Sequence, residues 1–180
     1  HVGKVVKKNN RTAETWYRKS AIQGNAAAEN MIGWFYYKGL GGLSVDYGQA
    51  VEWFKKAVAQ EDACAYDSLA VMYRDGLGIK ENGFEAARLF RLAIKNLEEE
   101  SAEVFCNFAL LYERGADNFS RNEKKALEFY RKAAEVCPKD EYTRKAELKI
   151  DELNLLKKER QAEQLRRKAD ELQEAEERRK

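Results

Sequence analysis

The stretch AVEWFKKAVAQEDACAYDSLAVMYRDGLGI, residues 50–79, contains two helix-like segments joined by a short polar turn. In the first segment, two aromatic residues lie between Ala50 and Ala57, and in the second, Leu69 and Tyr73 are four residues apart. Both spacings gather apolar side chains on one face of an α-helix. The stretch therefore predicts a helix–turn–helix hairpin.

Both patterns recur along the chain. The first-helix pattern, [Ile/Leu/Phe]-[Gly/Ala]-x-x-Tyr-x-x-Gly, ends at glycines spaced by 37 and 39 residues, which suit left-handed helix caps: Gly39, Gly76 and Gly115. The second-helix pattern begins at alanines spaced by 37, 36 and 40 residues: Ala13, Ala50, Ala86 and Ala126. Hairpins too small to bury their own apolar faces must stack on their neighbours. The predicted fold is all-α, a right-handed α-solenoid with a long C-terminal helix.

The glycine-rich loop YYKGLGGLSVDYGQA, residues 36–50, raises the question of a phosphate site, because such loops before helices often bind phosphate. No copy of the loop continues into Gly-Lys-Ser/Thr or follows a run of β-branched residues. A structural turn, unlike a nucleotide site, is needed once per repeat. We therefore interpret these loops as turns.

Residues that can cap helices precede each predicted helix in a constant frame. Their short polar side chains can accept hydrogen bonds from the free N–H groups of a first helical turn. The seven predicted caps are Asn9, Asp46, Asn82, Asn122, Asn25, Asp62 and Ser101.

The patterns divide the chain into four parts. We expect an incomplete first repeat with only its second helix at 1–24, three hairpins at 25–138, a capping helix at 139–157, and a charged helical extension at 158–180. The capping helix has an apolar face that can cover the last hairpin: Ala146, Ile150, Leu153 and Leu156.

These blocks resemble the Sel-one-like repeat (SLR) family, a branch of the tetratricopeptide-repeat superfamily, over residues 12–138. The resemblance implies a scaffold that binds other proteins. The chain departs from the family pattern in two places: residues 116–120 lack the Gly-x-Gly form, and residues 96–100 lengthen the third hairpin.

In related solenoids the first helices line the concave wall, so residues opposite the buried stripe of each first helix are the candidate partner-binding residues. Trp34 and Tyr37 are the strongest candidates, since large aromatics dominate interface energetics. Packing of Trp34 against a neighbouring helix is the alternative interpretation. The candidate set is Asn30, Trp34, Tyr37, Lys38, Asp67, Val71, Arg74, Asp75, Cys106, Leu110, Glu113 and Arg114.

Beyond Lys157 the tail keeps a short seam of apolar residues with alternating spacings of three and four: Ala162, Leu165, Ala169 and Leu172. Three arrangements are open for it: a solvated single helix, a coiled coil with another copy or a partner, or a helix folded back on the solenoid.

Composition excludes several function classes. With 33 basic and 31 acidic side chains, the net charge is only +2, which gives no electrostatic reason to expect nucleic acid as the partner. No apolar run is long enough for a membrane span. The single histidine is His1, and the three cysteines lack metal-ligand or disulfide spacing. We expect no cofactor, no metal and no enzymatic activity.

The sequence therefore favours a non-catalytic scaffold or adaptor that binds a peptide or a partner helix on its concave surface. The alternative function is structural oligomerisation, with self-association through residues 158–180. Cysteine usage favours a soluble protein in a reducing, cytoplasmic setting, although a removed signal peptide remains compatible with the sequence.

Overall fold

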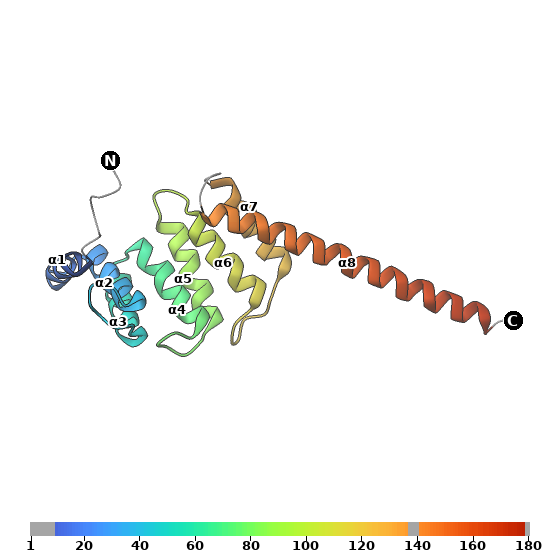
Figure 1. Ribbon diagram of the computed structural model, residues 1–180, viewed down its shortest axis with the longest axis horizontal. Coiled ribbons are helices and arrows are strands. Elements are labelled where there is room, and N and C mark those ends of the chain that lie inside the picture. The colour runs from blue at the N-terminus through green and yellow to red at the C-terminus, as the bar shows by residue number, and fades with distance from the viewer. Residues whose placement is uncertain (1–9, 137–140, 179–180) are drawn as a thin grey trace.

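The computed structural model describes residues 10–136 and 141–178, and all of its regular structure in these ranges is helical (Figure 1). The helices are α1 (Asn10–Ile22), α2 (Ala26–Lys38), α3 (Tyr47–Ala59), α4 (Ala63–Asp75), α5 (Gly83–Asn96), α6 (Ala102–Arg114), α7 (Glu123–Val136) and α8 (Glu141–Glu177).

The helices stack in chain order as hairpins. The pairs α2–α3, α4–α5 and α6–α7 pack side by side, with α1 against α2 at one end and α8 against α7 at the other. Figure 1 shows this row of short helices, from which α8 extends as a long arm. The predicted all-α solenoid with a long C-terminal helix is confirmed.

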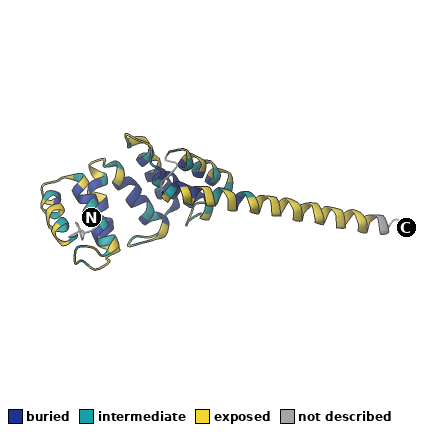
Figure 2. Ribbon diagram, turned by 45° about the horizontal axis from the view of Figure 1, so that its top comes forward, coloured by how far each residue is buried: buried dark blue, intermediate teal, exposed yellow. Residues whose placement is uncertain are grey.

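The core lies between the helices as two apolar clusters, a large one from α3 to α8 and a small one between α1 and α2, and its buried residues are dark in Figure 2. The alanines at which the second-helix pattern begins, Ala50, Ala86 and Ala126, lie in the first turn of their helices and are fully buried. Their small side chains let neighbouring helices approach closely, and Phe54 and Phe90 fill the space between them. The combination of a small alanine and a large aromatic side chain in each repeat thus sets the distance between neighbouring helices.

Six of the seven predicted helix caps are confirmed, and Asn9 lies outside the described residues. Each cap side chain accepts a hydrogen bond from the backbone N–H three residues later, the longest being that of Ser101 at 3.5 Å. The other five are Asn25, Asp46, Asp62, Asn82 and Asn122, with bonds of 2.8–3.0 Å.

Two of the three predicted left-handed caps are confirmed. Gly39 and Gly76 have φ/ψ of 66°/43° and 65°/29°. Gly115 differs, because its ψ is −174°, so it turns the chain into an extended segment instead of closing the helix in the left-handed helical region. The prediction of a left-handed cap was wrong there, where the loop also lacks the Gly-x-Gly form.

A glycine permits close backbone contact between consecutive hairpins, but its position changes along the solenoid. Gly78, in the loop after α4, has φ +68°, and a Cβ there would collide with the Tyr47 carbonyl group at the start of α3. In the next loop the glycine lies on the other side of the contact. Gly83 starts α5, donates its N–H to the Asp117 carbonyl oxygen at 3.0 Å, and leaves space for Phe119. This exchange compensates for the missing Gly-x-Gly form.

The first turns of α8 cap the solenoid. Ala146 and Leu153 are buried, Ile150 is half-buried, and the Thr143 hydroxyl donates to the Ala133 carbonyl oxygen on α7 at 3.1 Å. Leu156 is 37% exposed, so the expectation that it covers the last hairpin was wrong. The expected segment boundary near 138 lies outside the described residues.

The rest of α8 leaves the solenoid. Every residue from 155 to 175 is exposed, and the arm in Figure 2 is yellow on the visible side. The interpretation that the tail folds back on the solenoid was therefore wrong. An ion pair between Arg160 and Glu123 of α7, at 2.7 Å, holds the base of the arm.

Candidate functional site

The candidate residues occupy four equivalent positions on the first helices α2, α4 and α6, which contact one another in sequence. The innermost position, held by Asn30, Asp67 and Cys106, is buried, because neighbouring first helices meet there. The outermost position is exposed and is occupied by charged residues, Lys38, Asp75 and Arg114. The face formed by the first helices therefore has a buried floor and a charged rim.

A pocket of about 160 Å³ opens on this face where α2, α4, α6 and α8 converge. A cavity of about 15 Å³ holds one water molecule, so the pocket has room for a side chain. Six candidate residues line it: Trp34, Tyr37, Lys38, Asp67, Val71 and Arg74. Six others complete the wall: Phe54, Ser68, Met72, Glu103, Asn107 and Tyr142.

One wall of the pocket is aromatic. Trp34 meets Tyr37 edge-to-face with 5.1 Å between ring centroids, and meets Phe54 of α3 in the same manner at 6.4 Å. Trp34 thus packs on a neighbouring helix and also lines the pocket, so both interpretations of this residue describe part of its environment. Lys38 Nζ lies over both half-buried rings, 5.4 Å from the Trp34 centroid and 4.8 Å from the Tyr37 centroid.

The opposite wall carries two carboxylates. Asp67 accepts hydrogen bonds from Asn107 Nδ2 at 3.3 and 3.2 Å, and Glu103 accepts one from the Tyr142 hydroxyl at 2.5 Å. Burial, together with the negative charge of Glu103, raises the pKa of Asp67 to about 7, against the smaller opposing effects of Asn107 and Arg74. At neutral pH this carboxyl group is therefore close to half protonated.

Arg74 does not neutralise this wall. Its guanidinium pairs with Asp75 through two hydrogen bonds of 2.8 and 2.6 Å, and its Nη1 donates to the Asn107 carbonyl oxygen at 3.2 Å. Within the described part of the chain, Arg74 therefore bonds to a rim carboxylate, Asp75, and to a neutral residue, Asn107. The charge of Arg74 is paired within α4, and its hydrogen bond to Asn107 links α4 to α6.

The second half of the candidate set lies beside α8. Cys106, Leu110 and Arg114 line a larger hollow of about 480 Å³ that also includes Leu148 and Lys149 of α8.

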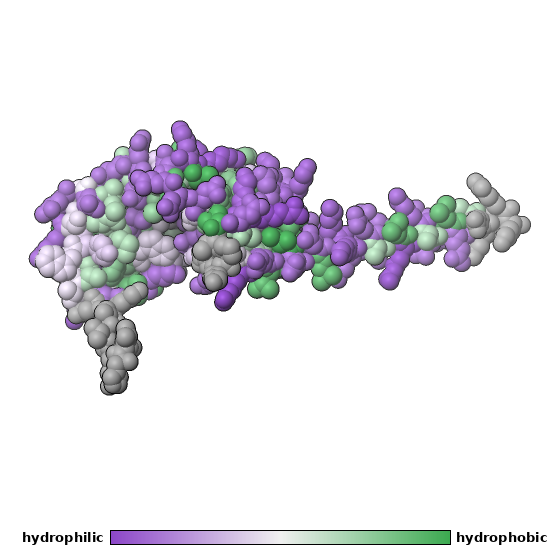
Figure 3. Space-filling view, turned by 90° about the horizontal axis from the view of Figure 1, so that it is seen from above, coloured by the Kyte–Doolittle hydropathy of each residue, from purple (hydrophilic) through white to green (hydrophobic). Residues whose placement is uncertain are grey.

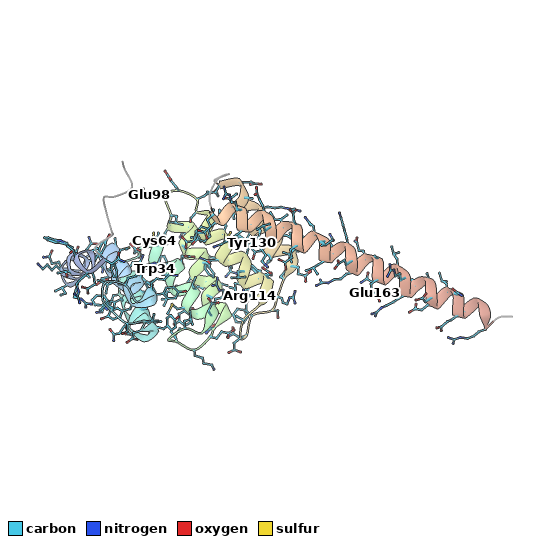
Figure 4. All side chains as sticks on the ribbon, viewed as in Figure 1. Trp34, Cys64, Glu98, Arg114, Tyr130 and Glu163 are labelled. Atoms are coloured by element: carbon cyan, nitrogen blue, oxygen red, sulfur yellow. The ribbon has the colours of Figure 1, made fainter. Side chains whose placement is uncertain are left out.

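Glu113 faces α7 and α8. It accepts hydrogen bonds from the Tyr130 hydroxyl at 2.6 Å and from Lys149 Nζ at 3.0 Å. Figure 4 labels Arg114 and Tyr130 in this region and Trp34 at the other end of the face.

Asn30 lines neither pocket. Its Oδ1 is buried without a hydrogen-bond partner among the described residues.

The candidate set lacks three important lining residues, Glu103, Asn107 and Tyr142. Glu103 lies on α6 one helical turn before Cys106. Asn107 is one position outside the chosen stripe, and Tyr142 is on α8, which was read as a cap and an arm. After α7, α8 takes the position that the first helix of a further hairpin would have. Extending the repeat spacing beyond α7 could therefore have predicted that the first turn of α8 contributes to the face formed by α2, α4 and α6. Asn107 gives no comparable signal, since its role depends on how α4 and α6 are rotated.

A family model for the Sel1 repeat matches residues 1–25, 26–62, 65–96 and 106–135. The chain belongs to the Sel1 repeat family. Sel1 repeat proteins are generally non-catalytic scaffolds for protein–protein interaction.

Solved structures of other Sel1 repeat proteins are similar. A Sel1 repeat protein from Oxalobacter formigenes is 30% identical with a TM-score of 0.55, and the match covers 72% of this chain and 51% of that one. The protective antigen c5321 of uropathogenic Escherichia coli, which has an SLR fold, is 27% identical with a TM-score of 0.63, over 72% of this chain and 27% of that one. This chain thus matches about half of the first protein and about a quarter of the second.

Comparison with curated proteins gives no significant match. Among the helices of residues 10–136 and 141–178, none combines the length and apolarity needed to cross a bilayer.

Proposed function

We propose that this Sel1 repeat protein is a non-catalytic adaptor that binds a segment of another protein along the concave face, with a basic side chain of that segment in the pocket. The observation that carries the proposal is the pair of carboxylates, Asp67 and Glu103, opposite the aromatic wall of Trp34 and Tyr37.

The charges of the pocket favour a cation. Within the described part of the chain, neither Asp67 nor Glu103 forms an ion pair, and their hydrogen-bond donors are the neutral groups of Asn107 and Tyr142. Asp67 is buried and Glu103 is half-buried, and carboxylates removed from water without a counter-ion are costly. An incoming ammonium or guanidinium group therefore gains both Coulomb energy and charge-assisted hydrogen bonds.

The aromatic wall favours the same class of side chain. Lysine and arginine bind to the faces of Trp and Tyr rings through cation–π attraction. Lys38 already places an ammonium over these two rings from the rim of the pocket. Lys38 is exposed, so a partner's basic side chain can displace it without breaking any buried contact.

A peptide library displayed on phage tests the proposal, since it assumes no particular partner. Peptides selected on the wild-type chain should share a lysine or arginine. An Asp67→Asn, Glu103→Gln double variant, which removes charge with little change in volume, should weaken the best peptide by about tenfold or more. Glu98→Gln, at an exposed loop position outside the pocket, is the matched control and should bind normally.

The selected peptides are then measured by fluorescence anisotropy. A library that yields no binder, binders without enriched basic residues, or binders with equal affinity for the double variant would overturn the proposal.

A further inference from the structure

The arm of α8 carries a line of exposed leucines. Leu148, Leu155, Leu165 and Leu172 are 58–71% exposed, although the rest of the arm is highly charged. Figure 3 shows green, hydrophobic patches among the purple side chains of the protruding helix. Single exposed leucines are ordinary, but a line of them on one helix face marks an interaction surface.

These leucines belong to one continuous seam. Starting at 148, steps of three and four residues give Leu148, Asp151, Leu155, Lys158, Ala162, Leu165, Ala169 and Leu172. At 100° per residue, Leu148 and Leu155 lie about 160–180° around α8 from Ala146, which faces the solenoid. The seam thus points away from α7, and its first residue, Leu148, borders the hollow beside α6. It is longer than the segment 162–172 found from sequence, because the fold leaves Leu148 and Leu155 exposed.

We infer that this seam binds the same seam of a second copy of the chain in an antiparallel coiled coil. In this arrangement Leu148 lies opposite Leu172 of the partner subunit, and Leu155 lies opposite Leu165 of the partner subunit. Both pairings fit one register, because residues 148 and 155, like 165 and 172, are seven apart. All four leucines of each chain are then paired with leucines over a length of about 36 Å.

The polar seam residues favour the antiparallel direction. In this register Lys158 faces Ala162 of the partner subunit and Asp151 faces Ala169 of the partner subunit. Because each charged side chain faces a small alanine, the charged side chain has room to extend to water. In a parallel, in-register pair, Asp151 and Lys158 would each face their own copies, which places like charges together in the seam.

In this register the charges beside the seam form one attractive pair and one repulsive pair, and the repulsive pair provides a test. Glu152 lies next to Arg166 of the partner subunit, which is an attractive pair. Glu159 lies next to its own copy at the two-fold axis, which is a repulsive pair. Arg160, which binds Glu123 of α7, points to the other side and stays free of the interface.

Sedimentation equilibrium of the full chain, from micromolar to millimolar concentration, measures the dimer. Leu165→Glu should weaken dimerisation by at least about a hundredfold, because it removes two buried leucines and adds two charges. Gln164→Glu adds the same charge one residue away, outside the seam, and should leave the dimer intact. Both positions are exposed, and far-UV circular dichroism checks that α8 keeps its helicity.

Glu159→Gln tests the direction and the register, since it relieves the repulsion at the axis. It should tighten the dimer by about two- to fivefold. A wild-type chain that stays monomeric over the whole range, or a Leu165→Glu variant that still dimerises, would overturn the inference. Dimerisation that Glu159→Gln does not strengthen would overturn the antiparallel register.

Discussion

Asn107 on α6 donates its Nδ2 hydrogens to both carboxylate oxygens of Asp67 on α4, at 3.3 and 3.2 Å. The same residue accepts hydrogen bonds from Arg74 Nη1 at its carbonyl oxygen and at its Oδ1, at 3.2 and 3.4 Å. One amide therefore stands between the buried acid and the nearest guanidinium. The two first helices are tied together, and the carboxylate faces the pocket without a counter-ion.

Asp67 should make the stability of the protein depend on pH. Its pKa is about 7 when folded against an ordinary value of 3.8, so folding favours the protonated form. The resulting stabilisation is complete below pH 4 and is lost as the pH rises through 7. In wild type, the free energy of unfolding should fall by at most about 1.4 kcal/mol for each unit by which the pKa of Asp67 is raised. Asp67→Asn should remove this dependence on pH. Urea unfolding of both proteins between pH 4 and 8.5 measures it; parallel pH profiles would contradict the assignment.

Binding of a basic peptide should strengthen as the pH rises from 6 to 8. A cation in the pocket requires ionised Asp67, so at lower pH binding must first displace a proton. Glu103 opposes this ionisation, and Arg74 and Asn107 assist it. Anisotropy titrations of one selected peptide should show up to about tenfold change in affinity per pH unit below the pKa. The slope should be absent in Asp67→Asn.

Gly78→Ala should destabilise the solenoid much more than Gly24→Ala. Both glycines have positive φ, +68° and +82°, and both variants carry the cost of that conformation, about 1 kcal/mol. Only at Gly78 does the added methyl group collide with the backbone of the preceding hairpin at Tyr47; the space around Gly24 is open. We expect a loss of about 3 kcal/mol or more for Gly78→Ala. Urea unfolding of the two variants measures the difference. Equal unfolding midpoints for Gly78→Ala and Gly24→Ala would show that the backbone at Tyr47 moves to accommodate the methyl group.

Tyr130→Phe should cost about 1–2 kcal/mol of unfolding free energy. The Tyr130 hydroxyl is buried and donates to Glu113 at 2.6 Å, and burial raises its pKa. Lys149 continues to bind Glu113 in the variant, so the carboxylate is not left alone. Tyr17→Phe is the control, because that side chain is 36% exposed, and should change stability by less than about 0.5 kcal/mol.

Local features of the fold could be predicted because they depend on residues close in sequence. A helix cap needs one short polar side chain and the N–H three residues later, and six such caps form as predicted. Gly39 and Gly76 likewise act within one turn of their own helices. Gly115 differs from the prediction because its conformation depends on the following loop, where Ala116 pairs with Phe119.

The candidate site could be predicted only in outline. Helical periodicity selects the side of α2 that carries Trp34 and Tyr37, and both line the pocket. Periodicity cannot distinguish a buried floor from an open wall, so Asn30 entered the candidate set although it is buried. Asn107 and Tyr142 reach the pocket through the rotation and packing of α6 and α8.

The sequence by itself determined the repeat, the helix ends and the apolar faces, because each follows from the spacing of neighbouring residues along one helix. The tertiary structure decided which polar groups share the pocket, where Asp67 loses its water and meets Asn107, and which leucines of α8 stay exposed. Those outcomes depend on distances between helices that are 30 to 40 residues apart, and packing alone sets such distances.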